Sequence, residues 1–87
     1  MNYRVELARD AARYLRRLGR VEQLRMVRRI DQLADDPFGP HTKPLTNLPG
    51  RRAARVGSYR IVFTVDEDAK VVRVSDIGPR GQVYRDL

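Results

Sequence analysis

The spacing of apolar residues changes twice along this chain, and the order of the changes constrains the fold more than any other sequence feature. Tyr3, Val5 and Leu7 alternate with charged residues, which is typical of a short strand with one buried face. From Arg9 the apolar spacing becomes three and four, as in an amphipathic helix. After residue 50 the alternation returns. A strand, a helical region and a run of strands therefore follow one another, which predicts an α+β fold.

Two helices are predicted in the helical region, with a turn at Gly19 between them. The apolar face of the first consists of Ala8, Ala11, Ala12, Leu15 and Leu18. Gly19 is placed to end this helix as its C′ residue. The apolar face predicted for the second consists of Val21, Leu24, Val27, Ile30, Leu33 and Ala34. Asp36-Pro37 ends it, since the residue before a proline avoids the helical region. So short a turn predicts an antiparallel helix hairpin.

Residues 36–50 contain four of the five prolines, Pro37, Pro40, Pro44 and Pro49. We expect a loop stiffened by proline here rather than a domain boundary, because little chain lies on either side.

The remaining chain is predicted to form strands. Ala54 and Val56 lead to a bend at Gly57-Ser58, and residues 59–65 then alternate up to a polar turn at residues 66–69. Residues 71–77 are β-branched and mostly apolar, as in a central strand, and residues 82–85 form a possible last strand. We predict one domain over residues 1–87, in which three or four antiparallel strands form one sheet, the helix hairpin covers one face, and the other face stays partly open.

The charge of the chain is strongly positive, at +7, and sixteen of its eighteen basic residues are arginine. Arginine presents a planar fork of donors that fits a phosphate, so polyanions are the expected partners. High-GC codon usage would also raise the arginine count, but it does not explain where the arginines lie.

Several function classes are not supported by the residues present. Cysteine is absent, no run of about 18 apolar residues could span a membrane, and the N-terminus lacks the apolar stretch of a signal peptide, so we expect a cytoplasmic protein. The single histidine, His41, lies in the proline-rich loop and is taken as incidental. No cofactor motif occurs and no transition-metal site is expected, although carboxylates could still hold Mg²⁺.

Positive charge on the predicted sheet remains as the candidate site. If Tyr59, Ile61 and Phe63 face the helices, strand alternation places Arg60 on the open face, together with Val62 and Thr64. An arginine fixed on a strand beside a tyrosine can bind a scissile phosphate and stabilise its transition state. A solvated face, or one that only binds RNA, has the same pattern.

Two stretches of this sequence resemble the RelE/ParE superfamily of type II toxin–antitoxin toxins. They are Arg55-Val56-Gly57-Ser58-Tyr59-Arg60-Ile61-Val62-Phe63 and Asp76-Ile77-Gly78-Pro79-Arg80-Gly81-Gln82-Val83-Tyr84-Arg85. The approach from Lys43-Pro44-Leu45 to Leu48-Pro49-Gly50 is similar as well. The resemblance covers essentially the whole chain and is closer to the RelE branch.

The resemblance implies a ribosome-dependent, metal-independent endoribonuclease that cuts mRNA in the A site by attack of a ribose 2′-hydroxyl. By position, Arg60 and Arg80 would stabilise the transition-state phosphate, and Tyr84 would orient or deprotonate the 2′-hydroxyl, or stack on a base. The residues expected to hold the RNA backbone are Lys43, Arg51, Arg52, Arg55 and Arg85. Many relatives carry His or Lys before the second arginine, where this chain has Pro79, which leaves the general base unassigned. His41 could take that role only if its loop folded over the sheet, which we do not expect.

The partners implied are the ribosome, mRNA and a small antitoxin with an acidic binding segment, which together with the toxin would form a hetero-oligomer. Two alternatives stay open. One is a ParE-like toxin that acts on DNA gyrase without cutting, which Pro79 mildly favours. The other is an RNA-binding module without catalysis.

Overall fold

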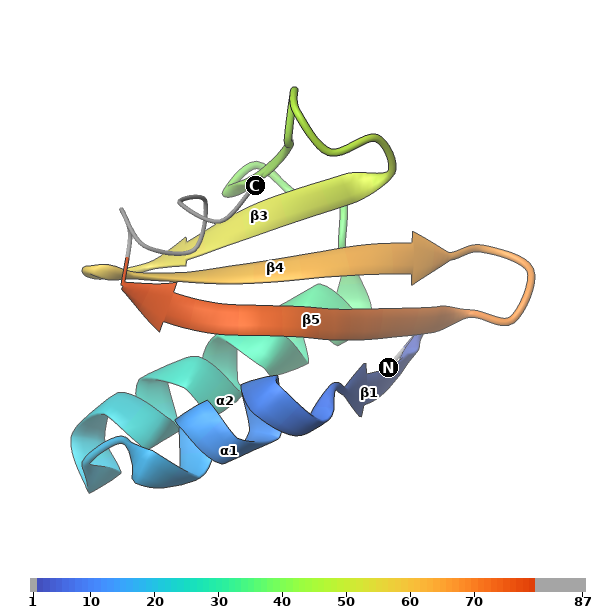
Figure 1. Cartoon of the computed structure of the whole chain (residues 1–87). Coiled ribbons are helices and arrows are strands. Elements are labelled where there is room, and N and C mark those ends of the chain that lie inside the picture. The colour runs from blue at the N-terminus through green and yellow to red at the C-terminus, as the bar shows by residue number, and fades with distance from the viewer. Residues whose placement is uncertain (1, 80–87) are drawn as a thin grey trace.

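A computed structural model describes residues 2–79 and shows two helices against one face of a five-stranded sheet (Figure 1). The elements in chain order are β1 (Arg4–Leu7), α1 (Arg9–Arg17), α2 (Arg20–Asp35), β2 (Thr42–Pro44), β3 (Arg51–Val56), β4 (Tyr59–Asp66) and β5 (Val71–Pro79). The strand order across the sheet is β1-β5-β4-β3-β2. The predicted α+β class, the helix hairpin and its position on one sheet face are confirmed.

The sheet is mixed, because its two edge strands join it differently. β3, β4 and β5 form the predicted antiparallel meander, whereas β1 pairs with β5 in parallel, with Val5 opposite Val72. The opposite edge strand, β2, pairs antiparallel with β3 inside the segment predicted to be a loop. The prediction was wrong here because prolines disfavour only interior strands. Pro44 is tolerated on an edge strand, where a missing N–H costs no ladder bond. The predicted last strand, residues 82–85, lies outside the described residues.

The β3–β4 turn depends on a glycine. Gly57 has a φ of +57°, which side-chain-bearing residues rarely adopt, and a Cβ there would come within 2.9 Å of an Arg25 Nη atom. The turn aligns Arg55 with Arg60 and Val56 with Tyr59. The sequence-predicted bend at Gly57-Ser58 is confirmed, and it fixes which residues of the two strands lie opposite each other.

The core lies between the two helices and the face of the sheet that they cover (Figure 1). It is built from Ala11, Met26, Ile30 and Leu33 of the helices and from Ala54, Val56, Ile61, Phe63, Val72, Val74 and Ile77 of the strands. Tyr59 packs beside it, with its ring edge against Tyr14 at a centroid distance of 6.3 Å. Burial, and then the neighbouring Tyr59, raises the pKa of Tyr14 above its ordinary value of 10.0. This contact anchors the start of β4 on α1.

The predicted core face of α2 is wrong in its first half. Val21, Leu24 and Val27 are 69%, 59% and 44% exposed, whereas Met26, Ile30, Leu33 and Ala34 are buried. A step of three residues falls about 60° short of a full helical turn, so a run of such steps winds around the helix. Val21 and Leu33 therefore cannot share a face. We call Val21, Leu24 and Val27 the outer stripe of α2.

Gly19 also differs from its prediction. It follows Leu18, the C-cap of α1, but its backbone is extended (φ −62°, ψ 163°) and it serves as the N-cap of α2. It is therefore not the left-handed C′ residue that was expected. No helix within residues 2–79 is long and apolar enough to cross a membrane.

Candidate nucleic-acid interface

Strand alternation brings cations from three neighbouring strands onto the sheet face turned away from the helices. On β3 and β4, Ala54 and Ile61 point into the core, so their neighbours in sequence point the other way. Arg55 lies directly opposite Arg60, and Lys43 of β2 lies opposite Ala53. Arg51 lies on the same face, opposite Thr64. The face is not open throughout, because Val62, which was expected to be exposed, is 1% exposed.

The opposition of Arg55 and Arg60 is unfavourable for the sheet itself. Like charges directly across an antiparallel pair are destabilising. Arg55 is exposed and Arg60 is half-buried.

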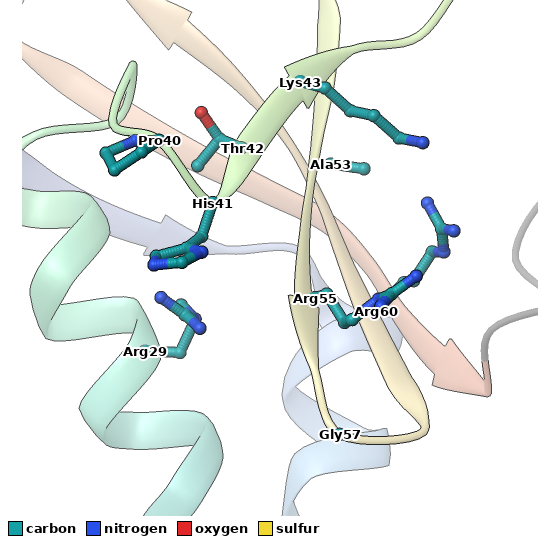
Figure 2. A pocket seen from close by; sticks show the side chains of 9 residues that line it. All are labelled: Arg29, Pro40, His41, Thr42, Lys43, Ala53, Arg55, Gly57 and Arg60. Carbon is teal, nitrogen blue, oxygen red and sulfur yellow. The ribbon is translucent and has the colours of Figure 1, made fainter.

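Two adjoining pockets lie over these cations. The first has a volume of about 380 Å³, and the residues that line it are Arg29, Pro40, His41, Thr42, Lys43, Ala53, Arg55, Gly57 and Arg60 (Figure 2). The second, of about 440 Å³, shares Lys43 and Arg60 with the first and continues along residues 44–48. Among the residues that the structure describes, neither pocket is lined by an Asp or a Glu. Both volumes are in the usual range of small-ligand sites.

His41 belongs to this site, although the sequence analysis set it aside as incidental. The segment before β2 runs beside the sheet edge, and Figure 2 shows the imidazole and the Arg29 side chain pointing toward each other. His41 lies in the turn that the Thr42 N–H closes onto Gly39 O, one residue before β2, so strand alternation does not place it. No local sequence pattern marked it as part of the site.

Arg52 is separated from the other predicted RNA-binding residues. Alternation turns it to the helix side of β3, where its Nη2 donates to Thr42 Oγ1 at 2.8 Å. Its guanidinium also lies 5.1 Å from the centre of the Phe38 ring. These contacts tie the segment before β2 to β3, so Arg52 helps to place His41 and Lys43. Lys43, Arg55 and Arg60 are the predicted residues that the structure brings together at the pockets, whereas Arg51 lies on the same face, opposite Thr64, and lines neither pocket.

The opposite end of the same face carries arginines of a different kind. Arg73 of β5 donates to Glu6 Oε1 at 3.0 Å and to Asp66 Oδ2 at 3.4 Å. Arg4 donates to Glu6 Oε2 at 3.1 Å. The bonds from Arg4 and then Arg73 lower the pKa of Glu6, while that of Asp66 is lowered first by the Ala69 backbone N–H and then by Arg73. The two carboxylates in turn raise the pKa of Arg73.

Three predicted site residues, Arg80, Tyr84 and Arg85, lie outside the described residues. Within residues 2–79, no group of three or more His, Asp or Glu side chains is arranged to hold a metal ion.

Comparison with solved structures identifies toxins with the same architecture. RelE in the archaeal RelE–RelB complex from Pyrococcus horikoshii is 26% identical, with a TM-score of 0.80 over 94% of this chain and 99% of that one. The RelBE2 toxin–antitoxin complex from Mycobacterium tuberculosis gives 27% identity and a TM-score of 0.81, over 92% of this chain and 100% of that one. The E. coli RelBE complex, at 23% identity and a TM-score of 0.78, covers 88% and 95% and shows the shared fold.

A search of curated proteins finds no match. The family of ParE toxins of type II toxin–antitoxin systems, parDE, matches residues 5–84. This match includes both helices and all of the described strands from β2 onward, together with most of β1. The chain therefore belongs to the ParE toxin family, within the RelE/ParE superfamily that its sequence resembles.

Proposed function

We propose that this toxin is a ribosome-dependent, metal-independent endoribonuclease that cuts mRNA in the A site and so inhibits translation. The observation that carries the proposal is the cationic, acid-free lining of the two pockets by Lys43, Arg55 and Arg60 among the described residues. The 26–27% identity to the RelE-type toxins of two solved complexes, over nearly the whole chain, supports the same assignment.

Arg60 is the central group of the proposed reaction. Attack of the 2′-oxygen on the adjacent phosphorus forms the 2′-O–P bond and breaks the P–O5′ bond, through a five-coordinate phosphorane with two negative charges. Charge-assisted hydrogen bonds from a half-buried guanidinium stabilise that state more than the singly charged phosphodiester. The products are a 2′,3′-cyclic phosphate and a 5′-hydroxyl.

The other predicted residues complete the site in this proposal. Arg80 supplies a second guanidinium to the phosphate, and Tyr84 orients the 2′-hydroxyl or stacks on a base. Lys43, Arg51, Arg55 and Arg85 hold the RNA backbone, and Arg52 acts mainly by positioning β2. The toxin acts in the cytoplasm, where its ribosomal substrate is.

The proposed protein partner is an antitoxin that docks on the outer stripe of α2. Val21, Leu24 and Val27 form an exposed apolar row, and exposed arginines such as Arg20 and Arg28 flank it. An amphipathic segment with acidic flanks would match both features, and it would order on binding. Its presence would give the toxin–antitoxin hetero-oligomer that the solved complexes of similar chains suggest.

Inhibition of DNA gyrase is the second candidate, and the ParE family match favours it. The cationic lining of the two pockets argues against it, because inhibition without RNA cleavage does not require such a lining.

Purified protein added to programmed ribosomes carrying a labelled mRNA tests the proposal, with free mRNA in EDTA and a gyrase supercoiling assay run in parallel. A cut within the A-site codon that leaves a 2′,3′-cyclic phosphate is expected. Intact mRNA together with loss of supercoiling activity would establish the second candidate instead.

A further inference from the structure

The proposed reaction needs a proton acceptor, and the cations of the pocket cannot supply one. Arginine keeps its proton at any physiological pH, and lysine keeps its proton until about pH 10. Pro79 provides no ionisable group where many relatives have one. Among the described residues that line the first pocket, the imidazole of His41 is the one side chain suited to proton transfer near neutral pH.

The position of His41 suits this task. Arg29 and His41 lie on one side of the pocket, and Arg55 and Arg60 lie on the other (Figure 2). Lys43 extends from β2 toward the Arg60 head group (Figure 2). A phosphate held by Arg55 and Arg60 would therefore leave its attached ribose between the two sides, within the pocket of about 380 Å³. His41 is exposed, so its ring is accessible to that ribose.

Hydrogen bonds of the neighbouring residues hold the backbone around His41. Thr42, the next residue, accepts the bond from Arg52 and itself donates to Gly39 O at 2.8 Å. Arg29 of α2 donates to Gln32 Oε1 at 2.7 Å, which fixes the guanidinium that faces the ring. The other charged groups lining the spaces beside His41 are Asp36, Lys43, Arg55 and Arg60.

We propose that His41 is the general base of the RNA cleavage reaction, an inference that rests on the proposed function. A ring nitrogen takes the 2′-hydroxyl proton as the 2′-O–P bond forms. The P–O5′ bond breaks with its electron pair on the 5′-oxygen, which is protonated by water, and the imidazolium then releases its proton to solvent. Tyr84 is left to orient the 2′-hydroxyl rather than to deprotonate it.

The test compares wild-type toxin with His41→Gln on programmed ribosomes, measuring kcat and KM from pH 5 to pH 9. Glutamine retains hydrogen bonding but cannot accept the proton. We expect kcat to fall by roughly 10²-fold or more, the usual range for a general base, with KM nearly unchanged. The wild-type rate should rise with pH, because a general base acts in its deprotonated form, and His41→Gln should lose that rise.

Two controls separate a chemical role from a structural one. Arg9→Gln changes an exposed residue of α1 on the helix side of the sheet and should cut like the wild type. His41→Gly should regain activity when free imidazole is added, which a merely misfolded loop would not do.

The outcomes distinguish the inference from the function on which it rests. Equal kcat values and pH profiles for wild type and His41→Gln would overturn the role of His41 and leave the nuclease assignment standing. A folded wild type that cuts nothing would overturn both.

Discussion

The two ends of the open sheet face carry the same residue type in opposite electrostatic settings. At the acid-balanced end, Arg4 bonds to Glu6 on its own strand, β1. Arg73 of β5 bonds to Glu6 and to Asp66, which lie on the two strands beside β5. At the acid-free end, defined by the residues lining the two pockets, Arg55 faces Arg60. No described lining residue is a carboxylate, and Asp76, opposite Val62 on the same face, lies outside both linings. The backbone is the same pleated sheet at both ends, so the difference lies in where the carboxylates were placed.

This contrast shows that arginine content alone does not identify a phosphate-binding site. An arginine bridging two carboxylates contributes to the fold and has its donors occupied. A cluster that repels itself across a strand pair reduces stability, and such local costs concentrate at functional sites. If the interpretation is right, substitutions at the two ends should fail in different assays.

Arg60→Gln should have the largest effect, a loss of A-site cleavage of roughly 10²–10³-fold, as for removal of one transition-state donor elsewhere. End-mapping on programmed ribosomes measures the cleavage, and circular dichroism checks the fold. Unchanged cleavage by Arg60→Gln would remove the acid-free end from the reaction.

Gly57→Ala should come next, with unfolding made easier by about 1–2 kcal/mol. The substitution forces a Cβ into a left-handed backbone conformation and against the Arg25 guanidinium. The midpoint of urea denaturation measures the effect. Gly19→Ser is the control, because nothing lies within 4 Å of a Cβ at that position and serine is a favourable N-cap for α2. Equal midpoints for the two variants would show that the hairpin does not depend on this glycine.

Lys43→Gln should have a smaller effect, on affinity for single-stranded RNA and on its salt dependence. Removing one cation that binds a phosphate lowers the slope of log affinity against log salt by about 0.7. Fluorescence anisotropy with a labelled oligoribonucleotide at several salt concentrations gives the slope. The same slope for Lys43→Gln and wild type would mean that RNA does not pass over β2.

Arg73→Gln should have the smallest effect, and only on stability. Glu6 and Asp66 have folded-state pKa values below their ordinary 4.5 and 3.8, so they stabilise the fold above those values. That contribution is lost as the pH falls through the lowered values. Urea midpoints measured from pH 7 down to pH 2 should therefore drop less steeply for Arg73→Gln than for wild type. An equally steep drop would show that Arg73 does not stabilise the two carboxylates.

Local patterns predicted much of this fold, and pairings between distant segments limited the prediction. The alternation around Phe63 and the β-branched run after Val71 identified β4 and β5, because each pattern repeats over many residues. The parallel pairing of β1 with β5 joins residues far apart in the chain, and no local signal specifies it. The outer stripe of α2 was wrongly assigned to the core. Its apolar residues indicate a helix, but only the helical angle between positions shows which of them face the sheet.

The candidate site likewise contains residues that local sequence patterns could place and residues that they could not. Arg55 and Arg60 could be placed on one face from alternation alone, since a strand has only two faces. Arg52 was grouped with them because of the family resemblance. It is one residue out of phase with Arg51 and Arg55, so it lies on the other face of the sheet, where it contacts Thr42 and Phe38. His41 was set aside because its position depends on β2, whose three residues carry too little pattern to be recognised.

The most direct test is mapped mRNA cleavage on programmed ribosomes by wild type, Arg55→Gln and Arg73→Gln. The two substitutions remove the same charge from the same sheet face, at its two ends. The account predicts that wild type and Arg73→Gln cut in the A-site codon and leave a 2′,3′-cyclic phosphate, whereas Arg55→Gln cuts more slowly. Equal cleavage by all three proteins, or a greater reduction in Arg73→Gln, would contradict it.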